Sequence, residues 1–420
     1  MLNLSYNLIQ KFKRKIFPFY KSKELKKIFE ILQKGHPKNI VTSRFVGGCV
    51  RKHLLGEKVD DIDVATILTT DQIKERFKDT NFKVIETGVK HGTLTIVSKN
   101  FKVELTTLRK DVKTDGRHAE VKYIDSWQLD SERRDFTINA IYLDISGKVF
   151  DPQMGTIDLK NNNVKFIGDP QKRIEEDYLR IIRFIRFKLV YDLKIEPTTY
   201  NAIKSNLDGI QRISKERILE ELFKILKNKN FLNINRSSHL KEIFLLIFPE
   251  FLYLSRLDRL KKIYDFSLIN DDILLAVLLL DGKDNHEYFA FKYNIPKKVK
   301  ENLEKVALNL NQIRKDKNFL SKDLHKNIYK NGKKYLIALN LINFSINSKI
   351  KVDEFNDTLN EILKCEIPEF HIDGKYLKEN GMQEGEALGK VLQIIEDEWL
   401  DNSFKISDER VKELIRNNTN

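Results

Sequence analysis

Residues 45–66 read FVGGCVRKHLLGEKVDDIDVAT, and this stretch decides the fold of the N-terminal part of the chain. An apolar strand ends at Gly47 and Gly48, and the pattern predicts a short helix from Val50 onward. Two glycines at such a turn let backbone N–H groups approach an anion without a Cβ in the way. The helix N-terminus and Arg51 add positive charge, so we interpret the turn as a cradle for a triphosphate.

Asp61 and Asp63 are the second feature of this stretch. Alternation on a strand places both carboxylates on one face and the apolar Ile62 on the other. Neighbouring carboxylates repel each other unless a divalent cation lies between them, and Mg²⁺ suits such oxygen ligands. A lone acidic pair is more often a solvated strand edge, but the glycine turn at close range favours a metal site. We predict a catalytic pair that holds two Mg²⁺ ions, with Glu104 in the strand KVELTTL as the third carboxylate.

The surrounding pattern predicts an α+β chain. β-branched runs over residues 44–150, separated by short turns, predict a small mixed, mostly antiparallel sheet. Amphipathic helical spacing dominates the rest of the chain and predicts one helix from Pro170 to Leu189. The pattern changes after Asp151 and Pro152, so we expect an α/β head followed by a long all-α body.

Composition limits the partners and the compartment. The 420 residues carry 75 Lys and Arg against 61 Asp and Glu, a net charge of +14. This balance favours nucleic acid as a partner, although a Lys-rich composition throughout would also produce it. The longest apolar run, Ile273–Leu280, is too short to cross a bilayer, so we expect no membrane partner. Cys49 and Cys365 have neither disulfide nor zinc spacing, which favours the cytoplasm, and nothing in the sequence indicates an oligomeric state.

In order, these motifs resemble those of the class II CCA-adding enzymes and their poly(A) polymerase relatives, within the DNA polymerase β-like nucleotidyltransferases. GGCVR with DDIDVAT is similar to the signature of that superfamily, and VELTTLR with DGRHAEV resembles its third-carboxylate strand and flexible loop. Three later segments resemble its ribose and triphosphate motif, its nucleobase-selecting helix and its neck motif: RRDFTINA (133–140), EDYLRIIRFIRF (176–187) and ISKERILEE (213–221). One departure is Lys52, where many members of the family carry Asp.

The resemblance implies template-independent addition of C, C and A to the 3′ end of tRNA, from CTP and ATP, with release of pyrophosphate. It implies a catalytic head over residues 1–150, a base-selecting neck over residues 151–230, and an elongated all-α body and tail over residues 231–420 that binds the tRNA acceptor stem. The implied nucleotide-binding residues are Gly47, Gly48, Arg51, Arg134, Asp135, Asn139, Asp177, Arg180, Arg183 and Arg186. One basic patch for RNA phosphates consists of Lys292, Lys297, Lys298 and Lys300, although a solvated Lys-rich face explains it equally well.

Base selection is expected from four residues that recur every third position on one helical face: Asp177, Arg180, Arg183 and Arg186. Cytosine and adenine each present an amino donor beside a ring acceptor, which one carboxylate and one arginine satisfy. Guanine and uracil present the reverse order and leave buried groups unpaired, at about 1–3 kcal/mol per group. Asp177 with Arg180 therefore predicts acceptance of CTP and ATP, whereas an ion pair on a solvated helix is the plainer interpretation.

Four other functions share part of this pattern. A poly(A) polymerase has the same catalytic signature but adds only A, and split-activity enzymes add only CC or only A. The segment RKDVKTDGRHAEV, residues 109–121, favours complete CCA addition, because CC-only relatives are truncated there. A DxD glycosyltransferase also binds a metal and a nucleotide, but it gives no reason for the order of the later motifs. A non-catalytic RNA-binding protein explains the charge but not the acidic pair.

Overall fold

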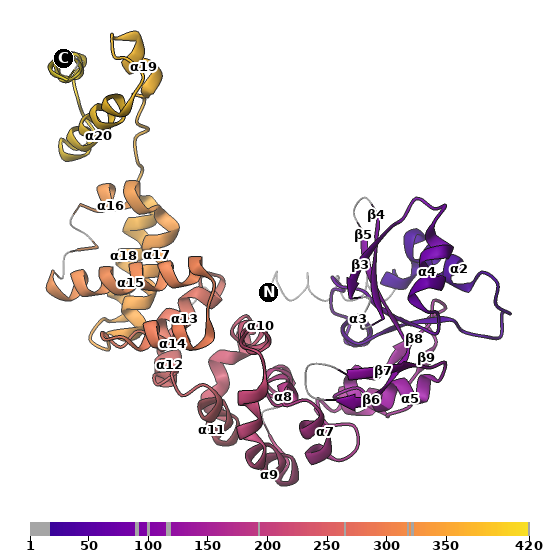
Figure 1. Ribbon diagram of the computed structural model, residues 1–420. Helices are drawn as coiled ribbons and strands as arrows, with labels where there is room; N and C mark the ends of the chain where they lie inside the picture. Colours follow the sequence, from indigo (N-terminus) through magenta and orange to yellow (C-terminus); the bar gives the residue numbers. More distant parts are fainter. Residues whose placement is uncertain are drawn as a thin grey trace. The chain divides into compact units, whose positions relative to one another are not determined.

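The computed structural model describes residues 17–88, 92–98, 101–114, 119–191, 194–263, 266–316, 319–320 and 323–418, apart from the side chains of 111–121 and 266. The loop predicted within residues 109–121 therefore lies partly outside the described residues. The chain forms two compact units, Met1–Leu252 with Phe289–Ile295 and Tyr253–Tyr288 with Pro296–Asn420. The first unit holds the strands and all the predicted catalytic and nucleotide-binding residues (Figure 1).

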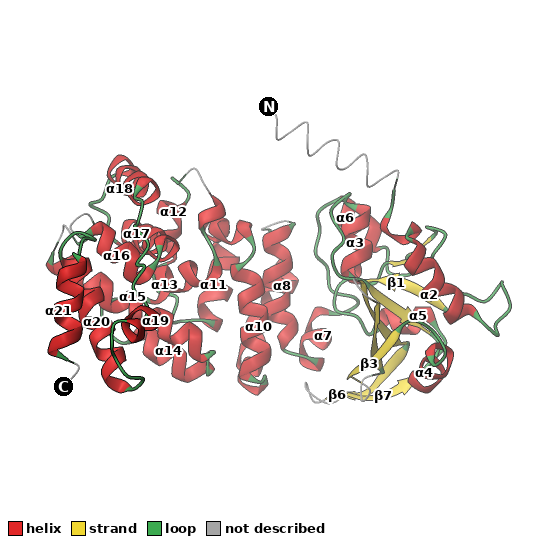
Figure 2. Cartoon of the chain, turned by 90° about the horizontal axis from the view of Figure 1, so that it is seen from above, coloured by secondary structure: helices red, strands yellow, loops and turns green. Residues whose placement is uncertain are grey.

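The head is built on a seven-stranded sheet with the order β3-β4-β5-β2-β1-β8-β9 (Figure 2). Its strands are β1 (Ser43–Val46), β2 (Asp63–Thr66), β3 (Lys83–Gly88), β4 (Thr93–Ser98), β5 (Phe101–Thr107), β8 (Tyr142–Leu143) and β9 (Val149–Phe150). β2 and β5 are parallel, and the other neighbouring pairs are antiparallel. A separate hairpin consists of β6 (Arg109–Thr114) and β7 (Ala119–Tyr123). The predicted mixed, mostly antiparallel sheet is confirmed.

The two faces of the sheet bury different layers. Phe45 and Val64 pair across β1 and β2, and the Phe45 ring lies 4.6 Å from the ring of Phe29 in α2 (Lys23–Gln33). Helix α4 (Thr70–Phe77) packs beside α2. The opposite face carries a buried cluster, packed against Trp127 of α5 (Trp127–Glu132), that consists of Val46, Ala65, Leu108 and Tyr142. Asp63 alternates with Val64 and so lies on this second face.

Short helices complete the first unit. They are η1 (Phe19–Lys21), α3 (Gly48–Leu54), η3 (Thr137–Asn139), α6 (Gly155–Lys160), α7 (Pro170–Glu176), α8 (Leu179–Val190), α9 (Pro197–Ser205), η4 (Leu207–Arg212), α10 (Lys215–Leu226), η5 (Lys229–Arg236) and α11 (Ser238–Ile247). α14 (Asn285–Tyr293) contributes residues to both units. Among these helices, α8 and α10 pack against each other and carry most of the predicted base-selecting groups and the neck motif.

The prediction of one helix from Pro170 to Leu189 is wrong, because the chain breaks into α7 and α8 at Asp177. Asp177 has an extended backbone, with φ −157° and ψ 103°, and its Oδ1 accepts a hydrogen bond from Leu179 N at 3.1 Å. The ring of Tyr178 packs against Gly209, where a Cβ would approach it to 2.0 Å. Short acidic side chains favour such caps, and apolar residues with helical spacing on both sides of the break conceal it from a periodicity argument.

The second unit is helical over its described residues, as predicted for the body and tail. Its helices are η6 (Leu254–Arg256), α12 (Leu257–Leu260), η7 (Phe266–Leu268), α13 (Asp271–Leu279), α15 (Lys297–Lys315), α16 (Leu324–Asn331), α17 (Lys333–Ile346), α18 (Val352–Lys364), α19 (Gly374–Glu379), α20 (Glu386–Asp401) and α21 (Asp408–Asn417). α13 is apolar all round from Ile273 onward and is buried. Helices α19 to α21 share a small core of their own around Ile395. No helix in the described ranges is both long and apolar enough to span a membrane.

Gly155 provides a test of the close packing under the head. A Cβ at this position would lie 2.1 Å from the backbone carbonyl oxygen of Thr137, which cannot rotate away. We expect Gly155→Ala to destabilise the first unit by about 1–3 kcal/mol through overpacking, measured by urea unfolding. The control is Gly389→Ala in α20, where the space around a Cβ is open, and it should be neutral or stabilising. Unchanged stability of Gly155→Ala would contradict the packing.

Candidate active site

The glycine turn lies beside Asp63. Gly47 has a φ of +72°, a left-handed conformation that favours glycine, and a Cβ there would lie 3.7 Å from Asp63 Oδ2. Gly48 begins α3, and the space where its Cβ would stand is open among the described residues. The predicted strand, turn and helix are therefore present, and one carboxylate of the acidic pair borders the turn.

Three carboxylates gather at the start of β2. Asp63 lies opposite Glu104 in the parallel ladder between β2 and β5, and the exposed Asp61 precedes it. Burial raises the pKa of Asp63 above its ordinary value, and the negative charges of Glu104 and Asp61 add to this effect. Arg134 and Arg51 oppose it, so both guanidinium groups lie close enough to act on this carboxylate. Acids held together in this way favour a bound cation.

The donor set fits a hard divalent cation, although the side chains are not yet arranged around one. Glu104 turns toward Lys102 and forms an exposed ion pair of 2.8 Å with it. Within the described part of the chain, no three His, Cys, Asp or Glu side chains form a ready metal cluster. Carboxylate oxygens are what Mg²⁺ prefers, so Asp61 and Asp63 can hold an ion, whereas Glu104 must first leave Lys102.

Lys52, the departure from the family pattern, holds the remaining acid of the DDID run. Its Nζ lies 3.4 Å from Asp60 Oδ2, and Lys58 Nζ lies 3.0 Å from the other oxygen. Hydrogen bonds from Lys58 first, and then from Lys52, lower the pKa of Asp60. Asp60 is therefore neutralised by lysines, in contrast to Asp63.

Arg134 is fixed by a buried acid that the sequence did not single out. Asp130 of α5 has no exposed surface, and its Oδ2 accepts hydrogen bonds from Arg134 Nη2 at 2.9 Å and from the Tyr142 hydroxyl at 2.8 Å. Arg133 Nη2 lies 2.7 Å from Oδ1. Burial would raise the pKa of Asp130, but the two arginines hold it far below its ordinary value. This anchoring keeps Arg134 over the Tyr142 ring and near Asp63.

Asp135 connects the RRDFTINA motif to α8. Its Oδ1 accepts a hydrogen bond from Asn139 Nδ2 at 2.8 Å, and its Oδ2 accepts one from Arg183 Nε at 2.8 Å. The Asn139 carbonyl oxygen in turn accepts a hydrogen bond from Arg51. Burial would raise the pKa of Asp135, but Arg183 and then Asn139 lower it to about 2. Four predicted nucleotide-binding residues therefore share one hydrogen-bonded network.

Phe187 gathers three of the predicted arginines around one ring. The guanidinium carbon lies 4.6 Å from its centroid for Arg186, 4.9 Å for Arg51 and 5.9 Å for Arg183. Phe136 packs edge-on against the same ring at 5.3 Å. The negative face of an aromatic ring attracts cations, so Phe187 orders charges that come from α3 and from α8.

The expected base-selecting pair is not joined in this structure. Asp177 Oδ2 accepts a hydrogen bond from Arg217 Nη2 of α10 at 2.7 Å. Arg180 Nη1 donates to Glu176 Oε2 at 2.6 Å, and its two Nη atoms also donate to backbone carbonyl oxygens at 2.8 and 3.1 Å. Because Asp177 precedes α8, the expected helical face begins only at Arg180.

Glu221 of α10 is the most prominent contact that sequence reasoning missed. It is 2% exposed, and its Oε2 lies 2.9 Å from Arg186 Nε. Its Oε1 lies 3.1 Å from Lys224 Nζ and 3.6 Å from Arg183 Nη1. An acid three residues after Ile218 falls on the apolar face of this helix, and that position was the signal available in the sequence.

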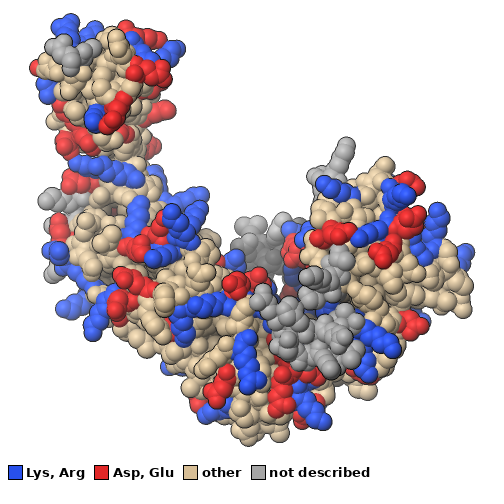
Figure 3. Space-filling view, in the orientation of Figure 1, with Lys and Arg blue, Asp and Glu red and all other residues tan. Residues whose placement is uncertain are grey.

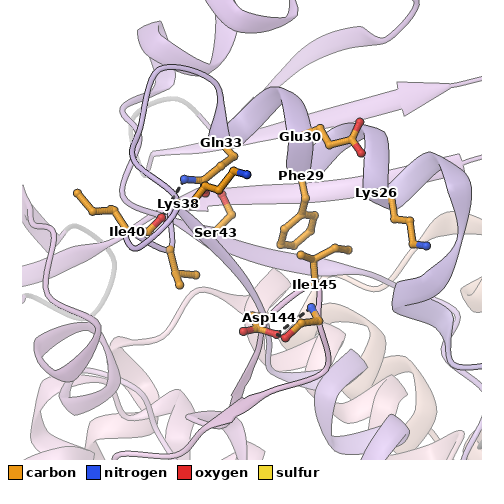
Figure 4. A pocket seen from close by; sticks show the side chains of 11 residues that line it. Lys26, Phe29, Glu30, Gln33, Lys38, Ile40, Ser43, Asp144 and Ile145 are labelled. Atoms are coloured by element: carbon orange, nitrogen blue, oxygen red, sulfur yellow. Dashed lines mark hydrogen bonds between the residues drawn. The ribbon is translucent and has the colours of Figure 1, made fainter.

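A cavity of about 460 Å³ lies elsewhere in the head (Figure 4). It is lined by α2, by the segment that leads into β1 and by the turn between β8 and β9, with Phe29 and Ile145 at its apolar part. Gln33 Nε2 donates to the carbonyl oxygen of Ile40 at 2.9 Å on its border. None of the predicted site residues lines this cavity.

The predicted basic patch is partly neutralised. On the face shown in Figure 3, basic and acidic side chains are intermixed. In the first unit Lys292 Nζ lies 2.5 Å from Glu250 Oε1. In the second unit Lys297 and Lys300 each lie 3.7 Å from a glutamate one turn later. Three of the four predicted lysines therefore have an acidic partner, which reduces their charge toward RNA.

Comparison with known families assigns two parts of the chain. Residues 43–165 match the family described as "Poly A polymerase head domain". Residues 192–253 match the family described as "Probable RNA and SrmB- binding site of polymerase A". The first match contains the glycine turn and the acidic pair, and the second contains α10 with Arg217 and Glu221.

Similar proteins cover nearly the whole chain. The human "CCA tRNA nucleotidyltransferase 1, mitochondrial" is 32% identical over 408 residues, which cover 89% of this chain and 86% of the human one. The Danio rerio protein of that name is 31% identical, and the match covers 93% of this chain and 92% of the Danio rerio protein. The "CCA-adding enzyme" of Streptococcus pyogenes is 29% identical, and the match covers 88% of this chain and 92% of the Streptococcus pyogenes protein. The solved CCA-adding enzyme of Bacillus stearothermophilus in complex with CTP has a TM-score of 0.67 at 22% identity. The superposition covers 94% of this chain and 98% of the Bacillus stearothermophilus chain.

Asp135→Asn tests the network that joins the head motif to α8. The pKa of Asp135 is lowered to about 2 from 3.8, so its stabilisation is complete above pH 3.8 and is lost as the pH falls toward 2. We expect the variant to lose about 3–5 kcal/mol at pH 7, because Arg183 keeps its charge without its main partner. The difference in unfolding free energy between the parent and the variant should become smaller only below about pH 4. Urea unfolding at a series of pH values measures it.

The matched control for this variant is Asp125→Asn, which removes an exposed acid from the same unit. It should change stability by less than about 0.5 kcal/mol at every pH. A constant difference between Asp135→Asn and the parent down to pH 3 would contradict the depressed pKa.

Proposed function

The chain belongs to the class II CCA-adding tRNA nucleotidyltransferases, and on that premise we propose that it adds C, C and A to the 3′ end of tRNA without a nucleic acid template. CTP and ATP are the substrates, and pyrophosphate is released. The observation that carries this proposal is the acidic pair Asp61 and Asp63 beside the Gly47 turn, with Arg134 and Arg51 acting on the same carboxylate.

We propose Mg²⁺ as the divalent ion of this family at Asp61 and Asp63, with two ions bound when Glu104 joins them. The raised pKa of Asp63, caused by burial and by its acidic neighbours, supports a cation at this place. A bound ion would stabilise the charge that develops on the phosphate oxygens and on the leaving pyrophosphate. The residues themselves orient the substrate: the turn at Gly47 and Gly48 admits the triphosphate, and Arg134 meets it from a position that Asp130 already fixes.

Base selection is proposed for Asp177 and Arg180, on either side of the start of α8. Asp177 would accept the amino group of cytosine or adenine, and Arg180 would donate to the neighbouring ring nitrogen. Both side chains have other partners, Arg217 and Glu176, so the proposal requires an exchange of hydrogen bonds when the base enters. Asn139 and Asp135 keep Arg51 and Arg183 in place during that exchange.

A poly(A) polymerase is the second candidate, because the family description that matches residues 43–165 carries that activity. It would use the same acids and the same turn. The two functions differ in the second nucleotide they accept and in where addition stops, and incorporation assays separate them.

The proposed compartment is the cytoplasm. Both cysteines are free and buried, which agrees with a reducing environment. The human, mouse and Danio rerio relatives are named as mitochondrial, and fluorescence microscopy of the tagged chain tests the compartment directly.

The deciding experiment incubates the purified chain with a tRNA transcript that lacks its 3′ end. We expect two C residues from CTP alone, and a final A once ATP is added, because one Asp–Arg pair accepts both bases. GTP and UTP should be incorporated poorly, and addition should halt after the third nucleotide. Long adenosine tails from ATP alone would favour the poly(A) polymerase, and a protein that binds tRNA without incorporation would refute both enzymes.

Asp63→Ala tests the acidic pair, with Asp60→Ala as the matched control in the same run of acids. Asp63 borders the glycine turn, whereas Asp60 is exposed and paired with Lys52 and Lys58. Asp63→Ala should lower CTP incorporation by about 10²–10³-fold or more, since it removes a proposed ligand of the metal ion that would stabilise transition-state charge. Asp60→Ala should stay within about threefold of the parent. Equal losses in the two variants would remove the special role of Asp63.

A further inference from the structure

Glu221 is a buried carboxylate that the proposed reaction does not use directly. It is 2% exposed and lies on α10 with Ile218, Leu222 and Ile225, which are also buried. An apolar residue of similar volume in place of a buried ionic group is often neutral or stabilising. Packing alone therefore gives no reason for an acid at this position, and the reason must come from the cations that it holds.

Of those cations, Arg186 depends most on Glu221. Arg183 is already held by Asp135, with Nε to Oδ2 at 2.8 Å, and its distance to Glu221 is 3.6 Å. Lys224 is half exposed, so its charge does not depend on Glu221 for solvation. Among the described residues, Arg186 has Glu221 as its ion-pair partner, with Nε to Oε2 at 2.9 Å. Burial lowers the pKa of Arg186 to about 10, and the charge of Glu221 counters that effect.

The contact between Arg186 and Glu221 is close but not aligned. At 2.9 Å, neither Arg186 Nε nor Glu221 Oε2 has a well-directed hydrogen bond within the described part of the chain. Buried polar atoms are normally satisfied, and exceptions concentrate where a ligand or a movement completes them. The Nε edge of the guanidinium faces Glu221 of α10, and the Arg186 side chain is 21% exposed, so the group can also meet oxygens that approach from solvent.

The outer edge of Arg186 belongs to the triphosphate end of the proposed site. Its guanidinium stacks on Phe187, the ring that Arg51 also faces from the helix after the glycine turn. Along α8, Arg186 is six residues beyond Arg180, which corresponds to about 9 Å at the usual helical rise. A base at Arg180, as proposed above, would therefore be too far away for Arg186 to read, whereas a triphosphate at the glycine turn would lie on the side of Arg51, which shares the Phe187 ring with Arg186.

We propose that Glu221 is a positioning residue that sets the guanidinium of Arg186 for the triphosphate of the incoming nucleotide. This inference rests on the proposed function. Glu221 does not touch the nucleotide: it fixes one edge of Arg186 so that the other edge forms paired hydrogen bonds with phosphate oxygens. Since CTP and ATP share the triphosphate, Glu221 affects both nucleotides equally and leaves the choice of base unchanged.

Glu221→Gln is the test, and Glu220→Gln, at the exposed neighbouring position on α10, is its matched control. The KM values for CTP and for ATP should both rise by about tenfold, with kcat within about threefold, because binding common to ground and transition state is lost. Calorimetric titration should show the same rise in Kd for CTP. The ratio of CTP to UTP incorporation and the KM for tRNA should not change, and Glu220→Gln should match the parent.

A purely structural role predicts different results. Glu221→Gln would then melt at a lower temperature and give fewer active molecules, with unchanged KM and Kd, and this outcome overturns the proposal. Glu221→Asp retains the carboxylate and should recover part of the lost affinity; an Asp variant no better than the Gln variant also overturns it. A changed CTP to UTP ratio would place Glu221 with the base-selecting groups and contradict the triphosphate role.

A double variant, Arg186→Gln with Glu221→Gln, keeps the test decisive even where Glu221→Gln alone folds poorly. It removes both partners of the ion pair, so neither charge is left without its partner. In the Arg186→Gln background, adding Glu221→Gln should change KM by less than about twofold, since the path through Arg186 is already lost. A further tenfold rise would show an independent role and refute the inference. Failure of the parent protein to incorporate CTP or ATP would instead refute the proposed function.

Discussion

The buried ion pair between Asp135 and Arg183 is the interaction on which the site depends. It joins the RRDFTINA motif of the head to α8, and both Asp135 oxygens are occupied, by the Phe136 and Asn139 donors on one side and Arg183 on the other. A buried charge in this condition is stable only because every acceptor is satisfied. Arg51 is held by the same network through Asn139, so the turn beside Asp63 and the neck helix keep one geometry.

Carboxylates of two kinds are separated around this network. Asp130, Asp135 and Glu221 are buried and each holds arginines, and the pKa of Asp130 and of Asp135 is lowered by them. Asp63 is different, because burial and neighbouring acids raise its pKa. An acid whose charge is disfavoured by its surroundings is stabilised by an incoming cation, whereas a fully paired acid has no need of one. Asp63 therefore suits metal binding, whereas Asp130, Asp135 and Glu221 orient arginines.

Fixed arginines have a further physical consequence. An arginine side chain is long and flexible, and ordering it on binding costs conformational entropy of up to about 2 kcal/mol. Arg134, Arg183 and Arg186 each have a buried acidic partner within the protein: Asp130, Asp135 and Glu221 respectively. The entropy cost of ordering these arginines is thus met during folding. Their positive charges are already in place when an anion, such as the proposed triphosphate, binds.

The sequence predicted those parts of the site whose causes are local. Gly47 needs its left-handed backbone because of the turn itself, and Asp63 alternates with Val64 whatever lies above the sheet. The break at Asp177 was missed because a capping carboxylate and the packing of Tyr178 on Gly209 outweigh an unbroken apolar period. The partner of Asp177, Arg217 of α10, is distant in sequence, so no spacing rule could supply it.

Glu176 and Glu221 differ in how far their partners can be predicted from sequence spacing. Glu176 lies four residues before Arg180, a spacing that predicts an ion pair on the helical register, and the pair is present despite the break at Asp177. Glu221 gave a weaker signal, an acid on an apolar face, which indicates that a buried partner exists without naming it. Identification of Arg186 as that partner required the packing of α8 against α10.

The same distinction between fixed and exchangeable pairs bears on how one site can accept two bases. The side chains of Asp177 and Arg217 are 25% and 32% exposed, and Glu176 is 36% exposed, so water can replace these contacts as they open. The Asp177–Arg217 pair, partly exposed on both sides, contributes about 0–1 kcal/mol, less than the about 1–3 kcal/mol that a mismatched buried base would forfeit. Arg180 is only 11% exposed and also donates to two backbone carbonyl oxygens, so it is held more firmly than Asp177. Asp177, which is proposed to read the base, can therefore change its partner when the required base changes from C to A. The groups proposed for the triphosphate must not change, because that part of CTP and ATP is identical, and they are the ones held by deeply buried acids.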